Sequence, residues 1–168
     1  MKGLAIGTDD FKKIIQENCY YVDKTLFIEE ILKDKSEVKL FTRPRRFGKT
    51  LNISMLKYFW DISNKEENRK LFQGLEIESS PYIEEQGKYP VIYITLKDMK
   101  YGTWKEILEE MQFLVSELFY SYQFLLKDLN EFDIPLFKNI IMKKANISEL
   151  SNSLKLLSRI LKNYYQKK

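Results

Sequence analysis

The feature that most constrains the fold of this chain is the segment LFTRPRRFGKT at residues 40–50, which ends in Gly48, Lys49 and Thr50. It follows a short apolar run at residues 38–41 and precedes a helical pattern that begins at Lys49. A strand, a loop ending in Gly-Lys-Ser/Thr and a helix occur in this order in phosphate-binding domains of the P-loop class. The sequence therefore predicts an α/β fold in which residues 38–41 form the strand that leads into the loop.

The residue types in this loop are those that bind the phosphates of a nucleotide. The N-terminus of a helix presents backbone N–H groups and the positive end of the helix dipole to an anion. In such a site Lys49 would contact the β- and γ-phosphates, and the Thr50 hydroxyl would ligate Mg²⁺. A side chain at Gly48 would keep the backbone away from the phosphate. We therefore predict ATP and Mg as cofactors, with Thr50 as the metal ligand.

Three of the five arginines of the chain, Arg43, Arg45 and Arg46, lie in this loop. Guanidinium is planar, permanently charged and suited to bidentate phosphate contacts, so the cluster favours phosphate binding. One residue departs from the general motif, since Arg43 stands where the motif has its first glycine, five residues before Gly48. The alternative interpretation is a basic surface turn that precedes Gly-Lys-Thr at the start of a helix.

Segments spread over nearly the whole chain carry a more specific pattern. They are YYVDKT at residues 20–25, TRPRRFGKTL at 42–51, SML at 54–56, YF at 58–59, LFQGL at 71–75, YPVIYI at 89–94, and residues 153–165. Together they resemble the N-terminal part of the bacterial and archaeal family known as predicted AAA-ATPases. In that family an Arg-Pro-Arg-Arg-Phe-Gly-Lys-Ser/Thr loop replaces the form that begins with glycine, so Arg43 fits the family.

The resemblance implies a helix-rich, three-layer P-loop NTPase-like fold of the AAA (ASCE) type and a nucleotide site. It also suggests that residues 21–23 pack near the adenine or ribose. The other interpretation is that Tyr21 and Val22 belong to the core and that Asp23 caps the helix beginning near Thr25; both stay open. The predicted cofactor-binding residues are Arg45, Arg46, Phe47, Gly48, Lys49, Thr50, Leu51, Tyr21 and Asp23.

Hydrolysis of ATP at a P-loop needs an acid after a hydrophobic strand and a group that orients the attacking water. The one candidate is Asp98, which follows the apolar run at residues 91–96, but Lys97 intervenes and no second acid follows directly. In the family the acidic Walker B strand would begin just beyond Lys168, so the chain looks truncated before that strand. We therefore predict no catalytic residue and negligible ATP hydrolysis by this chain alone.

The amino-acid composition limits the classes of protein to which the chain can belong. The chain has 168 residues, 44% of them hydrophobic, which suits one globular domain over residues 1–168. It has no histidine, which excludes a His base and a Ser-His-Asp triad, and the single Cys19 excludes an internal disulfide. No apolar run approaches the roughly 18 residues that span a bilayer, and the N-terminus does not read as a signal peptide. We expect a cytoplasmic protein without membrane contact.

Hydrophobic periodicity and capping signals predict most of the chain to be helical. The apolar runs at 38–41 and 91–96 are predicted strands, and in the family's sheet the strands that would lie between them are missing here. Each would then present unpaired backbone edges. Residues 130–135 should break the helical pattern. Helices are expected at residues 10–17, 25–32, 49–62 and 64–72, from a capping box at 103–106, and from 146–149 to near the C-terminus.

Two functions from different classes remain. The first is an ATP-binding, AAA-type P-loop domain that hydrolyses ATP only in a full-length relative. The second is a non-catalytic, basic helical module that binds nucleic acid or a protein through Arg43, Arg45 and Arg46. The expected partners are the nucleotide and, through the C-terminal region that family members have beyond this chain, a protein or DNA; in many of them that region carries a nuclease-like domain.

Overall fold

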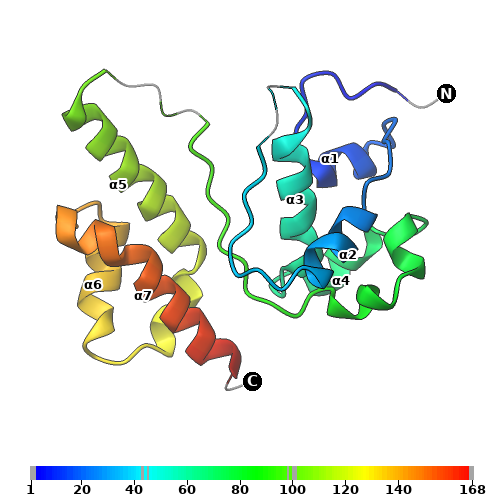
Figure 1. Cartoon of the computed structure of the whole chain (residues 1–168). Helices are drawn as coiled ribbons and strands as arrows, with labels where there is room; N and C mark the ends of the chain where they lie inside the picture. Colours follow the sequence, from blue (N-terminus) through cyan, green and yellow to red (C-terminus); the bar gives the residue numbers. More distant parts are fainter. Residues whose placement is uncertain (1–2, 43, 45, 98, 100–101, 167–168) are drawn as a thin grey trace. The chain divides into compact units, whose positions relative to one another are not determined.

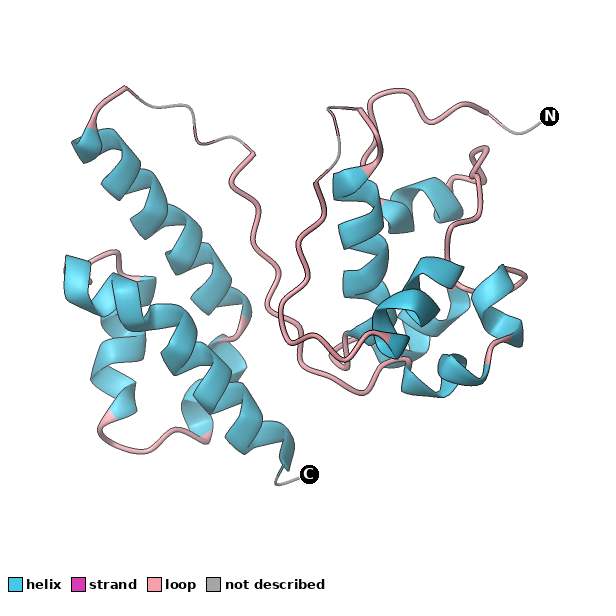
Figure 2. Ribbon diagram, viewed as in Figure 1, coloured by secondary structure: helices cyan, strands magenta, loops and turns pink. Residues whose placement is uncertain are grey.

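The computed structural model of this chain describes residues 3–42, 44, 46–97, 99 and 102–166 (Figure 1). The chain divides into two compact units, Met1–Val91 and Ile92–Lys168. Helices joined by loops make up the described parts of both units, as Figure 2 shows. Each unit has its own hydrophobic core.

The first unit packs its helices around an aromatic core. The Phe72 ring lies 5.0 Å from the Phe11 ring and 5.4 Å from the Phe59 ring, and all three side chains are buried. The Phe11 N–H donates to Ser54 Oγ (2.9 Å), which ties the first helix to the third. The elements are α1 (Phe11–Gln16), α2 (Leu26–Lys33), α3 (Lys49–Trp60), α4 (Lys65–Lys70) and two 3-10 helices, η1 (Glu76–Ser79) and η2 (Pro81–Glu85).

The second unit is a helical bundle with a separate core. Its centre includes the rings of Phe119 and Phe137, which lie 4.9 Å apart. Ser116 Oγ donates to the carbonyl of Ile141 (2.7 Å) and links two of the helices. The elements are α5 (Trp104–Ser121), η3 (Gln123–Lys127), α6 (Asp133–Ile141) and α7 (Ile147–Gln166).

The predicted α/β, three-layer P-loop fold is wrong for this structure. Its described residues contain no strand, and their only β pairing is one isolated parallel bridge between Asp61 and Tyr89. A strand exists only when a second segment pairs with its N–H and C=O groups, and residues 38–41 have no such partner here. Val38 and Leu40 are accordingly 85% and 84% exposed.

The second predicted strand, at residues 91–96, is also wrong for this structure. The described segment belongs to no strand, and Leu96 is 59% exposed. Ile92 packs against the core of the second unit. An apolar run thus indicates that its side chains favour burial, but the run does not specify which other element of the protein covers them.

The α-helices of the structure were predicted from the sequence except for one, α6 (Asp133–Ile141). Asp10 caps α1, and Thr103 with Glu106 forms the expected capping box of α5. The break predicted at residues 130–135 is shorter than expected, because α6 already begins at Asp133. Pro135 lies in the first turn of α6, where a helix needs no N–H donor, so this proline does not stop the helix. None of the helices in the described part of the chain is both long and apolar enough to cross a membrane.

Candidate functional site

The turn before α3 is held by a residue with left-handed backbone conformation. Gly48 is the N-cap of α3 and has φ +71°, and Arg46 two residues earlier also has a positive φ of +69°. A Cβ placed on Gly48 would meet no atom within 4 Å. The protein itself therefore requires glycine here for its backbone conformation and not for lack of space.

The N-terminus of α3 has no side-chain cap at its N-cap residue. Gly48 has no side chain to cap the helix, and the first turn contains no acidic residue. By contrast, Asp10 accepts from the Lys13 N–H at α1 (2.9 Å). The first N–H groups of α3, together with the helix dipole, therefore favour an anion at this end.

Lys49 folds back along the loop. Its Nζ donates to the carbonyl of Pro44 at 2.9 Å, and its side chain is partly buried. A small hollow lies beside it, with walls that include the rings of Phe27 and Phe41, 5.0 Å apart and edge to face. The ammonium group is thus positioned over the turn that leads into α3.

The remaining loop residues divide between surface and core. Arg46 is exposed, and the Phe47 side chain is 59% exposed. Thr50 is half-buried in the first turn of α3, and Leu51 packs against the core of the first unit. Arg45, like Arg43 and Asp98, lies outside the described residues. The structure therefore brings Gly48, Lys49, Thr50 and Leu51 together at one helix end.

Tyr21 packs against α3. Its hydroxyl donates to Met55 Sδ at 3.4 Å, and its ring lies 5.4 Å from Phe11, edge to face. Burial, with a smaller contribution from the negative charge of Asp23, raises the pKa of Tyr21 to about 12. Tyr21 therefore packs against α3, the helix that follows the loop. The predicted contact of Tyr21 with the adenine or ribose of a nucleotide stays a prediction.

Asp23 holds the start of α2. Its Oδ1 accepts from the Thr25 N–H (2.8 Å) and from the Thr25 hydroxyl (2.7 Å). Its Oδ2 accepts from the Glu76 N–H at 2.8 Å. Both carboxylate oxygens of Asp23 thus accept from the protein itself, Oδ1 from Thr25, the N-cap residue of α2, and Oδ2 from Glu76, which is distant in the sequence. A contact of Asp23 with the ribose or adenine remains untested.

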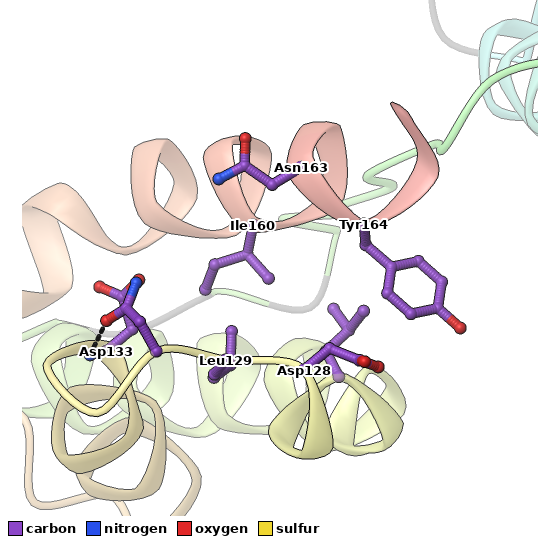
Figure 3. A pocket seen from close by; sticks show the side chains of 8 residues that line it. Asp128, Leu129, Asp133, Ile160, Asn163 and Tyr164 are labelled. Carbon is purple, nitrogen blue, oxygen red and sulfur yellow. Dashed lines mark hydrogen bonds between the residues drawn. The ribbon is translucent and has the colours of Figure 1, made fainter. Parts of the chain in front are cut away.

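A second hollow lies in the second unit between the turn before α6 and α7 (Figure 3). Figure 3 shows Ile160 and Tyr164 of α7 on one side, with Asp128 and Asp133 facing them from the other. Asp133 is buried, and it accepts from Arg159 of α7 and from the Asn130 amide, each at 2.7 Å. These bonds give Asp133 a structural role, since they join α6 to α7.

Sequence reasoning singled out neither Asp133 nor Gln86, a buried glutamine of the first unit. For Asp133 a local signal exists, because acidic residues are frequent in the first turn of a helix. For Gln86 no local signal exists, because its burial depends on residues far away in the sequence. Tertiary structure alone identifies that residue.

Comparison with known proteins gives the family. The family described as "Predicted AAA-ATPase" matches residues 5–168, and the chain belongs to it. An uncharacterized protein from the vnfD 5′ region of Azotobacter chroococcum mcd 1 is 38% identical over 77 residues. That match covers 45% of this chain and 14% of that protein, so the chain spans a small part of this relative. No solved structure matches the chain.

Proposed function

We propose that this chain is the ATP-binding part of an AAA-ATPase-like protein and that the loop before α3 holds the nucleotide phosphates. The observation that carries the proposal is the uncapped N-terminus of α3, with Lys49 folded over the turn in front of it. Family membership supports the nucleotide class. We further propose that residues 1–168 are the N-terminal part of one such domain.

The residues present fit a phosphate. Gly48, the N-cap residue of α3, provides no side-chain cap and has open space around its α-carbon. Lys49 would exchange the neutral carbonyl of Pro44 for a charged phosphate oxygen, which is the stronger acceptor. Mg²⁺, when bound, would neutralise phosphate charge, and the Thr50 hydroxyl would hold it.

Backbone strain in the loop supports the same proposal. Arg46 has a Cβ and still adopts φ +69°, a conformation that costs L-residues roughly 1–2 kcal/mol. Such strain persists where surrounding structure enforces it and is concentrated at ligand-binding sites. An arginine held in this conformation directly before an anion-favouring helix end is consistent with a ligand clamp.

The second function, binding of nucleic acid or a protein by a basic module, has one observation in its favour. The Arg46 and Phe47 side chains are both exposed and adjacent, and a cation beside an aromatic ring suits single-stranded nucleic acid. The uncapped helix end is explained by either function, but Lys49 turned toward the loop favours a compact phosphate group. We therefore place nucleotide binding first.

The test is titration of the chain with ATP and Mg²⁺ by calorimetry, using Lys49→Ala and the control Lys70→Ala on the exposed face of α4. Loss of one charge-assisted contact should weaken ATP binding by about 10- to 100-fold in Lys49→Ala only. Equal ATP affinity in the chain and in Lys49→Ala would reject the phosphate assignment. Binding of single-stranded DNA without binding of ATP would support the second function.

We also propose that this chain alone does not turn ATP over. Phosphoryl transfer depends on positioned metal ions and charge stabilisation, and no Walker B acid is recognisable in the sequence. Phosphate release by the purified chain should therefore stay at the level of Lys49→Ala. Turnover that both Lys49→Ala and Asp98→Asn abolish would show that the chain contains a complete site.

A further inference from the structure

Two helices of the second unit carry opposite charge. Helix α5 has four glutamates and one lysine, whereas α7 has no acidic residue after Glu149 and has two lysines and an arginine beyond it. Some of these charges are paired within the chain. The lysine of α5, Lys105, lies 3.9 Å from Glu109, and Arg159 of α7 donates to Asp133 at 2.7 Å. The charges without such a partner therefore decide what each helix attracts.

Glu110 and Glu117 on α5 and Lys155 and Lys162 on α7 have no such partner. In the part of the chain that the structure describes, none of the four forms an ion pair. Glu110 is half-buried and the other three are exposed. The members of each pair are seven residues apart, which is nearly two helical turns, so they lie on one face of their helix, about 10.5 Å apart along its axis. The two acids and the two bases thus have the same spacing.

The surface beside the two glutamates suits the side chain of a lysine. Glu110 and Glu117 line a hollow with a volume of about 430 Å³, which lies between α5 and residues 93–95. Its walls also include the apolar side chains of Ile94, Leu114 and Leu118. A lysine packs its four-carbon stem on apolar surface and keeps its ammonium group at the polar edge. The hollow therefore offers an apolar floor and two carboxylates to the lysines of another molecule.

Aromatic rings add to this face of α5. Phe113 lies between the two glutamates in the sequence and is 48% exposed, and Tyr120 is 54% exposed. The Nζ of Lys143 lies 4.1 Å from the centroid of the Phe113 ring, so this ring accepts a cation within the chain itself. Exposed aromatic residues are enriched in protein interfaces. The face thus has the composition of a protein interface as well as the charge to select a basic partner.

We propose that α5 of this chain docks α7 of a second copy, with Lys155 and Lys162 of one copy against Glu110 and Glu117 of the other. A second copy is favoured over a different protein because the chain itself carries the matching charges at the matching spacing. A twofold axis between the two copies forms this contact twice, since each copy has both faces. Complementary charge selects the partner and speeds association more than it adds affinity, so the dimer should be reversible.

The test is sedimentation equilibrium of the whole chain, without nucleotide, at about 0.02 M and about 0.5 M salt. The chain should be a dimer at low salt and submillimolar concentration. High salt should weaken dimerisation at least about tenfold, because it screens exposed charges. A chain that stays monomeric at low salt would overturn the proposal, and so would a dimer that is indifferent to salt.

Exchanging the charges of the two faces makes the test specific. The double variants Glu110→Lys with Glu117→Lys and Lys155→Glu with Lys162→Glu should each dimerise about 100-fold more weakly, because each places like charges across the contact. An equimolar mixture of the two variants restores opposite charges at both contacts of the twofold pair. The mixture should therefore form a heterodimer, which also shows that both variants are folded.

Two further variants keep the outcome decisive. Lys155→Gln with Lys162→Gln changes only exposed side chains, so it should fold and dimerise about tenfold more weakly. Lys138→Glu with Lys144→Glu is the matched control, because it reverses two exposed lysines of the same unit that lie outside both helices. It should dimerise as the unchanged chain does. Dimers that persist in both charge-reversed variants would overturn the proposal, as would a mixture that stays monomeric or a control that dissociates equally.

Discussion

Replacing Gly48 by alanine tests the geometry on which the candidate site depends. Gly48 adopts φ +71°, and a Cβ at this position would meet no atom within 4 Å. The cost of the substitution is therefore backbone strain alone, about 1–2 kcal/mol for an L-residue in the left-handed region. Alanine also reduces the conformational entropy of the unfolded chain, which stabilises the folded state by about 0.4–1 kcal/mol. A net loss of about 1 kcal/mol in the free energy of unfolding follows from these terms.

The assay is urea denaturation of the whole chain in a Trp104→Phe background, so that the fluorescence of Trp60 at the end of α3 reports the first unit, with ATP titration of the same samples. Gly74→Ala is a matched control, because Gly74 has φ +75°, equally open surroundings and a position after α4. It should lose about the same stability and keep its ATP affinity. Gly48→Asn should lose less stability, since asparagine tolerates the left-handed region.

Two results would refute the reasoning. If Gly48→Ala unfolds at the same urea concentration as the unchanged chain while Gly74→Ala does not, the left-handed turn before α3 does not exist in solution. If Gly48→Ala and Gly74→Ala weaken ATP binding equally, the effect comes from stability and not from the loop.

Two further predictions concern the residues around the loop. The pKa of Tyr21 is raised from 10.0 to about 12, so its contribution to stability is complete below pH 10 and is lost as pH rises toward 12. The difference in unfolding free energy between the unchanged chain and Tyr21→Phe should therefore fall over this window in urea denaturation; a pH-independent difference would contradict the burial of Tyr21. Thr25→Val removes the hydroxyl that accepts from the buried Ile77 N–H (3.1 Å) and should cost about 1–3 kcal/mol by the same measurement. A loss below a few tenths of a kcal/mol would mean that the N–H of Ile77 finds another acceptor.

Local sequence predicted the helices because their determinants are close together in the chain. Asp10 lies three residues from the N–H that it caps, and Thr103 and Glu106 close their capping box over the same distance. Pro135 misled the prediction because its effect depends on its position in the helix, and the start of α6 was not evident from the pattern. Short-range rules thus predicted the presence of most helices better than their boundaries.

The candidate site was predictable in its residue types and only partly in its arrangement. The order Gly48, Lys49, Thr50 before a helical pattern placed a glycine at the N-cap of α3, and the structure has it there. For Tyr21 and Asp23 the sequence left two roles open, because the contacts of each depend on partners distant in sequence: Met55 for the first and Glu76 for the second.

By itself, the sequence determined the helices other than α6, the caps of α1 and α5, the glycine at the start of α3 and the membership of the family. Tertiary structure decided the rest. The apolar runs at 38–41 and 91–96 have strand composition, but a strand needs a ladder of hydrogen bonds to a second segment, and the described residues form no strand. Gln86 is polar and unremarkable in the sequence, and only packing against α4 and the core makes it a buried, unpaired amide. Burial and pairing are relations between distant residues, and a local pattern does not specify them.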